Sequence, residues 1–488
     1  MRAFLEPLHA LEEIARLETK LKKEPGIRMI SGCIDSQKPH LMYGIGNDFK
    51  YKVIVTFNEQ KAREIYEAYL FFDRNAVYYP AKDVLFYQSD LRGNVLTRER
   101  IFALKSIAAK NGLTLVTTYD ALMNRMPKPA AFIQAVRTYR VGDEIDLEDF
   151  RRKLVSMGYE ACAQVETAGQ FAVRGGIIDI FPLTEEVPYR MELWGDEIDS
   201  LRSFDVESQR SIENLQSVEI YPAAELILTD QAKEEGTRRI QKDADSLYRT
   251  YRSEMKTEEA ARIKKAAEEI LEEVNERAGI DGIDAYLTYF DRDTVSLADY
   301  FEEKDTLFFL DEPERCAQRG EMTAQEFSES MKLRLEKGYI LPGQMETLYS
   351  PEETAAKLKR HCCVALGALE IKSGTFSYLE HYAVSARSIG AYHNSFELLV
   401  KDLKLYKKKG YAVILISGSK TRAKRLADDL MQEGLNCFYS EDYDHTVKPG
   451  EIMAVYGKVK KGYEYPLLSF AVISESDIFG KETRKKKK

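Results

Sequence analysis

The chain has 488 residues, of which 44% are hydrophobic and 31% are charged, and its formal net charge at pH 7 is −9. One hydrophobic core stops growing at about 250 to 300 residues, so this length predicts several domains, and the composition excludes a disordered or fibrous chain. The sequence contains no long uncharged apolar run and no secretory leader, which excludes membrane-spanning and secreted classes and predicts a cytoplasmic protein.

The first part of the chain alternates between helical and strand patterns. An apolar stripe with charged intervals predicts an amphipathic helix over residues 8–24. Short apolar runs predict strands at 28–32, 51–56, 77–80 and 113–118, with helices at 59–71 and 98–110. Strands that alternate with helices indicate a parallel sheet covered on both faces, so we predict a first α/β unit over residues 1–125.

The pattern changes after residue 125 to short strands with little helix between them, which predicts a small α+β insert over residues 126–214. Its strands are expected at 139–141, 171–174, 177–181 and 189–194, with turns at Gly175-Gly176 and Gly195-Asp196.

Two further segments follow the insert. Helices at 230–278 and a strand at 306–310 predict that residues 215–382 complete the first α/β unit. Strands at 411–416, 437–439 and 470–474, with a helix at 420–433, predict a second, smaller α/β domain over residues 383–480.

Residues 481–488 form a basic tail or linker with a charge of +5, which leaves −14 on residues 1–480. An acidic body disfavours duplex DNA as a tight ligand, because phosphate binding depends on Lys and Arg. The tail itself either contacts phosphate or is a solvated linker.

The segment after the first predicted strand is an incomplete phosphate-binding loop. Gly32 and Lys38 align with the first glycine and the lysine of the G-x-x-x-x-G-K-[ST] pattern, but Gln37 replaces the second glycine and Pro39 replaces the hydroxyl residue. The proline removes both the magnesium ligand and a backbone donor, so Lys38 alone is not expected to hold Mg-ATP.

An acidic pair, Asp311 and Glu312, follows the predicted strand at 306–310. This order is typical of the segment that engages magnesium and orients water in nucleotide-hydrolysing enzymes. Beside an incomplete loop we interpret the pair as part of a degenerate nucleotide site, with residual binding of ATP left open.

No catalytic constellation and no metal site is predicted elsewhere. The six cysteines lack paired C-x-x-C spacing and are expected to be reduced structural thiols. The histidines are scattered, without a nucleophile beside them, and we expect no cofactor.

The insert carries the residues of a family resemblance. The stretches Gly169–Pro182 and Pro188–Ser200 resemble the bacterial transcription-repair coupling factors and, more loosely, the excision-repair helicase UvrB. Further similar segments are Tyr79–Ala81 with Asp90–Asn94, and Ile473–Gly480. The resemblance covers nearly the whole chain, and it implies a UvrB-like, RecA-like α/β domain with a degenerate phosphate loop, an inserted domain and a following small domain.

The resemblance also implies a partner. In this family the insert recruits UvrA, and the family's contact positions fall here on Arg174, Arg190 and Trp194. Arg190 and Trp194 are four residues apart on one strand, so their side chains share a face, while Arg174 is expected on a neighbouring strand. Family members more often carry Phe where this chain has Trp194.

Regions that bind RNA polymerase and translocate on DNA would lie beyond Lys488, so the resemblance implies recruitment of UvrA without catalysis by this chain. The long aromatic hairpin with which UvrB clamps DNA does not fit within residues 88–97.

Three alternatives stay open. One is a UvrB-like DNA-dependent ATPase that uses Lys38, Asp311 and Glu312. Another is an intramolecular brake held against the motor domains of the intact factor. The third is a structural interpretation of the insert, in which Trp194 fills the core and the two arginines pair with Glu192 or Asp196.

Overall fold

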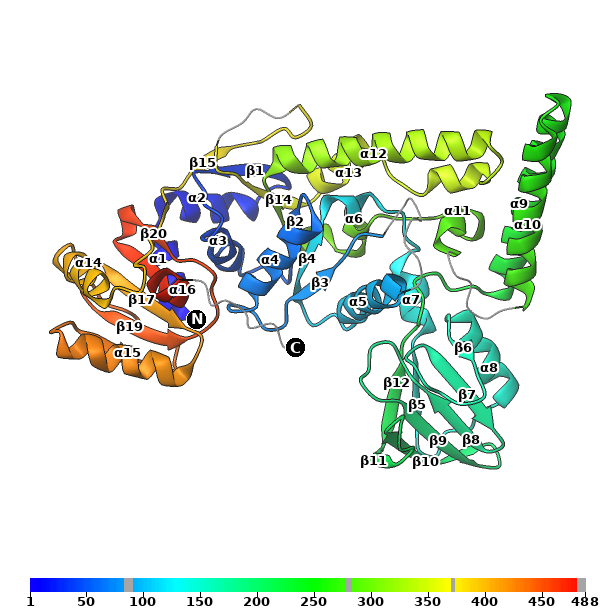
Figure 1. Ribbon diagram of the computed structural model, residues 1–488, viewed down its shortest axis with the longest axis horizontal. Helices are drawn as coiled ribbons and strands as arrows, with labels where there is room; N and C mark the ends of the chain where they lie inside the picture. The colour runs from blue at the N-terminus through cyan, green and yellow to red at the C-terminus, as the bar shows by residue number, and fades with distance from the viewer. Residues whose placement is uncertain (83–90, 277–282, 370–373, 481–488) are drawn as a thin grey trace.

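The computed structural model describes residues 1–82, 91–276, 283–369 and 374–480 (Figure 1). It confirms the predicted fold class, a multidomain α/β protein with an inserted α+β domain and a second small α/β domain. The tail at 481–488 and residues 83–90, which include part of one family-like segment and of the hairpin region, lie outside the described residues.

The centre of the molecule is a parallel sheet of seven strands in the order β15-β1-β14-β13-β2-β4-β3. The strands are β1 Gly26–Ser31, β2 Tyr51–Thr56, β3 Val77–Tyr79, β4 Leu113–Thr118, β13 Thr306–Asp311, β14 Cys362–Leu366 and β15 His381–Ala383. The inner strands are buried along their whole length, which explains their nearly continuous apolar runs. Sequence segments on both sides of the insert therefore build one sheet.

Helices cover both faces of this sheet. One face packs against α1 Arg2–His9, α2 Glu12–Leu21, α3 Lys38–Gly44 and α4 Glu59–Tyr69. The other packs against α5 Leu91–Ala108, α6 Tyr119–Met123, α12 Pro313–Glu336 and α13 Pro351–Lys359. Helix α7, Pro129–Ala135, leads into the insert.

The prediction of one helix over residues 8–24 is wrong, because the chain breaks at Leu11, whose backbone is extended. The break lets the apolar faces of both α1 and α2 enter the same core.

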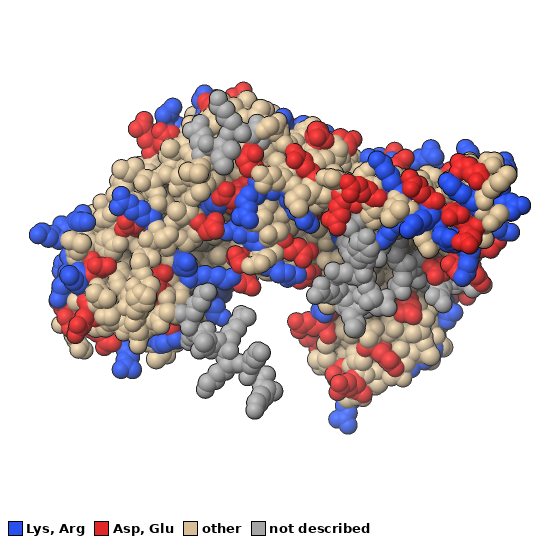
Figure 2. All heavy atoms as spheres, turned by 45° about the horizontal axis from the view of Figure 1, so that its top comes forward, with Lys and Arg blue, Asp and Glu red and all other residues tan. Residues whose placement is uncertain are grey.

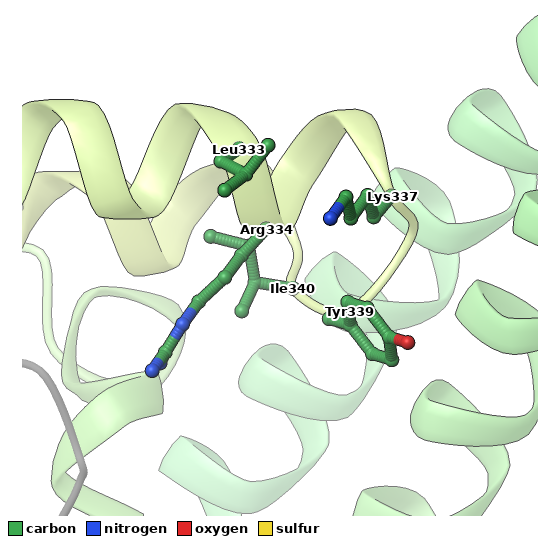
Figure 3. Close-up of a pocket in the computed structure, with 5 residues that line it drawn as sticks. All are labelled: Leu333, Arg334, Lys337, Tyr339 and Ile340. Atoms are coloured by element: carbon green, nitrogen blue, oxygen red, sulfur yellow. The ribbon is translucent and has the colours of Figure 1, made fainter.

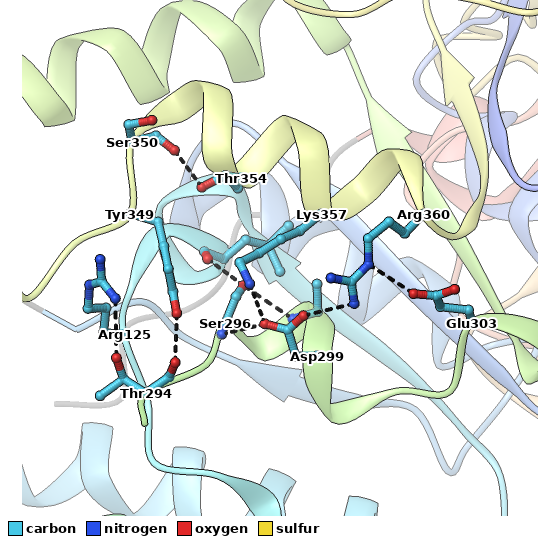
Figure 4. A network of polar contacts seen from close by, with 12 residues as sticks. Arg125, Thr294, Ser296, Asp299, Glu303, Tyr349, Ser350, Thr354, Lys357 and Arg360 are labelled. Carbon is cyan, nitrogen blue, oxygen red and sulfur yellow. Dashed lines mark hydrogen bonds and ion pairs between the residues drawn. The ribbon is translucent and has the colours of Figure 1, made fainter. Parts of the chain in front are cut away.

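Polar contacts fasten the short 3-10 helices η2 Leu297–Tyr300 and η3 Glu303–Asp305 to α13 (Figure 4). Asp299 accepts bonds from Lys357 at 2.6 Å and Arg360 at 3.3 Å, and Arg360 also reaches Glu303 at 2.9 Å. Two further 3-10 helices, η1 Ile283–Tyr286 and η4 Pro342–Glu346, flank α11 Leu287–Phe290 and the end of α12.

The insert contains a mostly antiparallel sheet in the order β11-β10-β9-β8-β7-β6 and a two-stranded pair of β5 with β12. Its elements are β5 Arg137–Arg140, α8 Leu147–Ser156, β6 Glu160–Ala161, β7 Gln170–Arg174, β8 Ile177–Ile180, β9 Tyr189–Trp194, β10 Glu197–Phe204, β11 Ser211–Leu215 and β12 Ser217–Ile220. The expectation of little helix missed α8, which packs Phe150 and Leu154 against one face of the sheet.

A long helical hairpin follows the insert and stands at the right edge of Figure 1. It consists of α9 Asp230–Ser253 and α10 Thr257–Glu276, which confirms the helical prediction for most of residues 230–278. In Figure 2, acidic and basic side chains intermingle over this edge of the molecule.

The last domain has a six-stranded sheet in the order β16-β20-β21-β17-β19-β18. Its elements are β16 Arg387–Ser388, α14 Phe396–Lys408, β17 Ala412–Ser417, α15 Lys420–Gln432, β18 Cys437–Tyr439, β19 Ile452–Tyr456, β20 Tyr463–Tyr465, η5 Pro466–Leu468, β21 Phe470–Ser474 and α16 Glu475–Phe479. Only three residues separate β15, in the first sheet, from β16, in this one. One face of this sheet shares a hydrophobic core with α1 and α3, so the two α/β units are packed together.

We propose the domain division 1–125, 126–214, 215–382 and 383–480, with one adjustment. Because β12 pairs with β5 along its whole length, the insert extends past residue 214 to Ile220.

A buried ion pair joins the segment after the insert to the first unit. Arg100 on α5 donates to Glu225 at 2.5 and 3.0 Å and to the carbonyl of Pro80 at 2.5 Å. Its guanidinium also lies 4.1 Å from the ring centre of Tyr79. Burial alone would raise the pKa of Glu225, but Arg100 and Lys82 outweigh it and lower the pKa to about 2.

The variant Glu225→Gln should be less stable than the parent chain at pH 7 by about 3 to 5 kcal/mol, because it leaves a buried guanidinium uncompensated. A carboxylate with a depressed pKa contributes stability above its unfolded value of 4.5, and this contribution is lost as the pH falls toward 2. The difference between the two urea-unfolding midpoints should therefore shrink between pH 4.5 and pH 2.

The matched control is Glu185→Gln, which breaks the half-exposed pair of Glu185 with Lys105 and should cost less than about 1 kcal/mol. Equal stabilities of Glu225→Gln and the parent chain at pH 7 would contradict the role of this pair.

Candidate functional site

The degenerate nucleotide site lies at the carboxyl edge of the parallel sheet, where β1, β2 and β13 end together. The ammonium of Lys38, in the first turn of α3, lies 2.6 Å from Asp311 and 2.5 Å from Glu312. Thr56, at the end of β2, donates to the second oxygen of Asp311 at 2.8 Å. The structure therefore brings together the lysine and the acidic pair that the sequence singled out.

The centre of this cluster is almost completely shielded from water, while Glu312 is partly exposed. Lys38 is 1% exposed and Asp311 is fully buried. Burial alone would lower the pKa of Lys38, but the charges and hydrogen bonds of Asp311 and Glu312 outweigh it and raise the pKa above its ordinary value. The lysine is thus held as a cation by its own chain.

Asp35 borders the cluster on the solvent side. It contacts Lys61 at 2.8 Å and Lys38 at 3.5 Å. Burial alone would raise the pKa of Asp35, but hydrogen bonds and charges from Lys61 and Lys38 outweigh this effect. The net shift of its pKa is therefore downward. Oxygens of Asp35, Asp311 and Glu312 lie within 4.8 Å of one another, a spacing that suits a cation. In this structure the Lys38 ammonium is a cation that contacts all three residues.

The loop before α3 uses its backbone donors internally. Five amides in this loop donate to oxygens of the chain at 3.1 to 3.2 Å, namely those of Gly32, Cys33, Ile34, Gln37 and Lys38. A phosphate-binding loop needs such amides free to surround the anion. In this conformation the loop offers little to a phosphate.

Gly32 and Gln37 have structural reasons to be where they are. Gly32 has a φ of +80°, and a Cβ there would lie 2.0 Å from the carbonyl oxygen of Val384, so this glycine permits close approach of the chain that links the two sheets. Gln37, directly before α3, has a φ of −92°, and its side-chain oxygen accepts from the amide of Ile34 at 3.2 Å. Pro39 occupies the first turn, where its missing amide costs nothing.

The last domain covers the same loop. Ser36 donates to the carbonyl of Gly462 at 3.0 Å. His40 lies fully buried between Tyr465, at 3.0 Å, and the carbonyl of Phe4, at 2.7 Å, and burial lowers its pKa to about 4. The first turn of α3 is thus held by contacts with the last domain and α1 as well as by the ion pairs of Lys38.

Lys38→Met should lower the free energy of unfolding by about 3 to 5 kcal/mol, because Asp311 would remain buried without its cation. Urea denaturation measures this change. The control Lys61→Met breaks a pair with a mostly exposed carboxylate and should cost less than about 1 kcal/mol. If both variants unfold at the parent midpoint, the cluster is not a structural element.

The second candidate site is the outer face of the insert sheet, opposite α8. Strand pairing places Ala172, Asp179, Arg190 and Arg202 in one row across β7 to β10, and Arg174, Ile177, Glu192 and Ser200 in the next row. Trp194 lies one step further along β9. All three residues of the predicted UvrA contact therefore lie on one face, as expected for Arg190 and Trp194.

Arg174 is not on a strand adjacent to β9, because the intervening hairpin places β8 between them. Asp179 on β8 joins the two arginines. It accepts from Arg174 at 2.6 Å and from Arg190 at 2.6 and 2.9 Å, and it is 1% exposed although it belongs to the outer face.

The structural interpretation of the insert is wrong in both of its parts. Trp194 is 83% exposed and fills no core, because its position continues the outer face beyond the last paired row. The two arginines pair with Asp179, because register places this carboxylate beside them, while Glu192 pairs with Arg202.

Asp179 is the residue of this candidate site that the sequence analysis missed. Its signal was a charged residue inside the apolar run Ile177–Ile180, which a strand tolerates only when the charge finds a partner.

An open hollow of about 390 Å³ at the end of α12 is lined by Leu333, Arg334, Lys337, Tyr339 and Ile340 (Figure 3). It holds no cluster of titratable groups comparable to those above. Within the described ranges, each helix is too short or too polar to cross a lipid bilayer.

Comparison with known proteins finds a family match on the insert. Residues 138–226 match the model of the UvrB interaction domain. The chain is 27% identical to the transcription-repair-coupling factor of Bacillus subtilis over 469 residues, which are 94% of this chain and 39% of that protein. The corresponding proteins of Staphylococcus epidermidis and Staphylococcus aureus are 27% and 28% identical over 90% and 86% of the chain and 37% and 35% of their own lengths.

A parallel α/β unit interrupted by a UvrB interaction domain defines the class of UvrB-like multidomain proteins. Within that class, the chain is similar over nine-tenths of its length to the amino-terminal region of transcription-repair coupling factors, which confirms the family resemblance. It spans about two-fifths of the length of these curated relatives.

Proposed function

We propose that this chain recruits UvrA to sites of transcription-coupled repair through the outer face of its insert, and that it performs no catalysis of its own. One observation carries the proposal. The segment that matches the UvrB interaction domain presents a guanidinium and a tryptophan to solvent on one face of its sheet, with Arg174 44% and Trp194 83% exposed.

The exposed tryptophan supports a protein-binding role. A large aromatic side chain in solvent is unfavourable for an isolated domain, and binding hot spots are enriched in Trp and Arg. Arg174 and Trp194 are separated by two strands and one row, which is about 12 Å, well within the footprint of one protein partner.

The double variant Arg174→Ala, Arg190→Ala should lose most of its affinity for purified UvrA. Truncation of a central hot-spot arginine costs about 2 kcal/mol or more, or roughly 30-fold in Kd. Surface plasmon resonance with immobilised UvrA measures the loss, and circular dichroism melting shows whether the fold is kept.

The control is the double variant Arg152→Ala, Lys153→Ala on α8, which removes two cations from the other side of the same insert. Unchanged UvrA affinity of the Arg174 and Arg190 variant would contradict the proposal.

The alternative function is a UvrB-like DNA-dependent ATPase with a divergent site at Lys38, Asp311 and Glu312. The geometry of the acidic pair at a strand end favours it, because these groups are the ones that bind magnesium and orient water. The internal bonds of the loop amides and the pairing of Lys38 oppose it.

Isothermal titration with Mg-ATP separates the two functions. We expect no binding up to millimolar nucleotide, because phosphate would have to displace two carboxylates from a buried lysine and free the loop amides. Saturable heat with a micromolar Kd would favour the enzyme, and Lys38→Met should then abolish that heat.

Further partners are proposed only for the longer relatives as whole proteins. RNA polymerase and DNA are proposed as partners of those longer proteins alone. An intramolecular brake, in which this chain is held against the motor domains of the intact factor, is the third candidate. A cytoplasmic location, with no cofactor, stays a prediction.

A further inference from the structure

The outer face of the insert sheet contains a buried carboxylate, Asp179, that the proposed function has not used. Asp179 sits between Arg174 and Arg190 and is nearly inaccessible to water. A buried carboxylate is costly unless it is paired and hydrogen-bonded. Within the described part of the chain, two guanidiniums donate all the hydrogen bonds that the Asp179 side chain accepts.

The two arginines are bound differently. Arg190 turns both Nε and Nη2 to Asp179, donates again to Gln209 at 2.9 Å, and stacks over Phe204 with its guanidinium carbon 4.2 Å from the ring centre. Its side chain is only 13% exposed. The hydrogen bonds to Asp179, followed by its charge, raise the pKa of Arg190 despite the opposing effect of burial.

Arg174 uses only one nitrogen for Asp179. Its Nη2 donates to Asp179 at 2.6 Å, whereas its Nε and Nη1 have no hydrogen-bond partner among the described residues. With 44% of its side chain exposed, it can offer these donors to another molecule. An Arg guanidinium prefers a carboxylate, which it can bind with two parallel bonds.

We propose that Asp179 is a positioning residue that holds the guanidinium of Arg174 ready for a carboxylate of the partner, and that Arg190 acts by holding Asp179. Arg174 and Trp194 then make the direct contacts, and Arg190 makes none. This inference rests on the proposed function, because it assigns separate roles to residues of the same UvrA-binding face.

The physical reason is preorganisation. A free arginine side chain loses rotamer freedom when it binds, which weakens the complex. Asp179 is fixed on a central strand and anchored by Arg190, so Arg174 is already ordered before the partner arrives. Asp179 also neutralises one of the two positive charges, which reduces the repulsion between Arg174 and Arg190.

The test is a double-mutant cycle in UvrA affinity with Asp179→Asn and Arg174→Ala. Asp179→Asn alone should weaken binding about tenfold, and Arg174→Ala about 30-fold. In the Arg174→Ala background, Asp179→Asn should cause no further loss beyond about twofold, because it acts through Arg174.

A purely structural role predicts the opposite result. If Asp179 only stabilises the sheet, its replacement should weaken binding by the same factor in both backgrounds, and this outcome overturns the proposal. The matched control is Asp149→Asn on α8, the same chemical change beside the arginine Arg152 on the other side of the insert, which should leave affinity unchanged.

A second variant covers the case in which Asp179→Asn unfolds the insert. Arg174→Lys keeps the charge of an exposed residue but loses the planar fork, so it should bind almost as weakly as Arg174→Ala. Parent-like affinity of Arg174→Lys overturns the proposal. If Arg174→Ala itself binds UvrA like the parent chain, the proposed function fails, whereas a loss with Arg174→Ala but not with Asp179→Asn sinks this inference alone.

Discussion

The central part of the molecule depends on one interaction, the double ion pair of the Lys38 ammonium with Asp311 and Glu312. It joins the start of α3 to the end of β13, and through Asp311 it reaches Thr56 at the end of β2. In a nucleotide-binding protein these groups would be separated by phosphate and magnesium. Here they contact one another directly, so the edge of the sheet is closed by its own side chains.

The insert uses charge differently. Its ion cluster around Asp179 lies on an outer face, and one of its two arginines remains partly in solvent on the same face as an exposed tryptophan. Both clusters bury a carboxylate against cations, but the first satisfies its lysine completely and the second leaves donors available. This contrast supports a division of labour, in which the α/β unit is a scaffold and the insert carries the binding face.

The strands of the central sheet could be predicted from sequence, because buried parallel strands are short apolar runs between helices. Chemistry at their ends could be predicted for Lys38, Asp311 and Glu312, since strand ends in such a sheet converge. The contact of Asp179 with two arginines could not be predicted from the sequence, because it depends on the register in which β7, β8 and β9 pair. The helix α8 was also missed, although Asp146 caps it and Phe150 and Leu154 give it an apolar face. The break at Leu11 was missed because it depends on the packing of α1 and α2 into one core.

Amide hydrogen exchange of the chain tests the central claim most directly, since one experiment reads both sites. With UvrA added, the account predicts slower exchange in β7 and β9 of the insert, and with Mg-ATP it predicts no change between Ser31 and Leu41. Slower exchange in that loop on addition of nucleotide, or an insert that UvrA leaves unprotected, would contradict it.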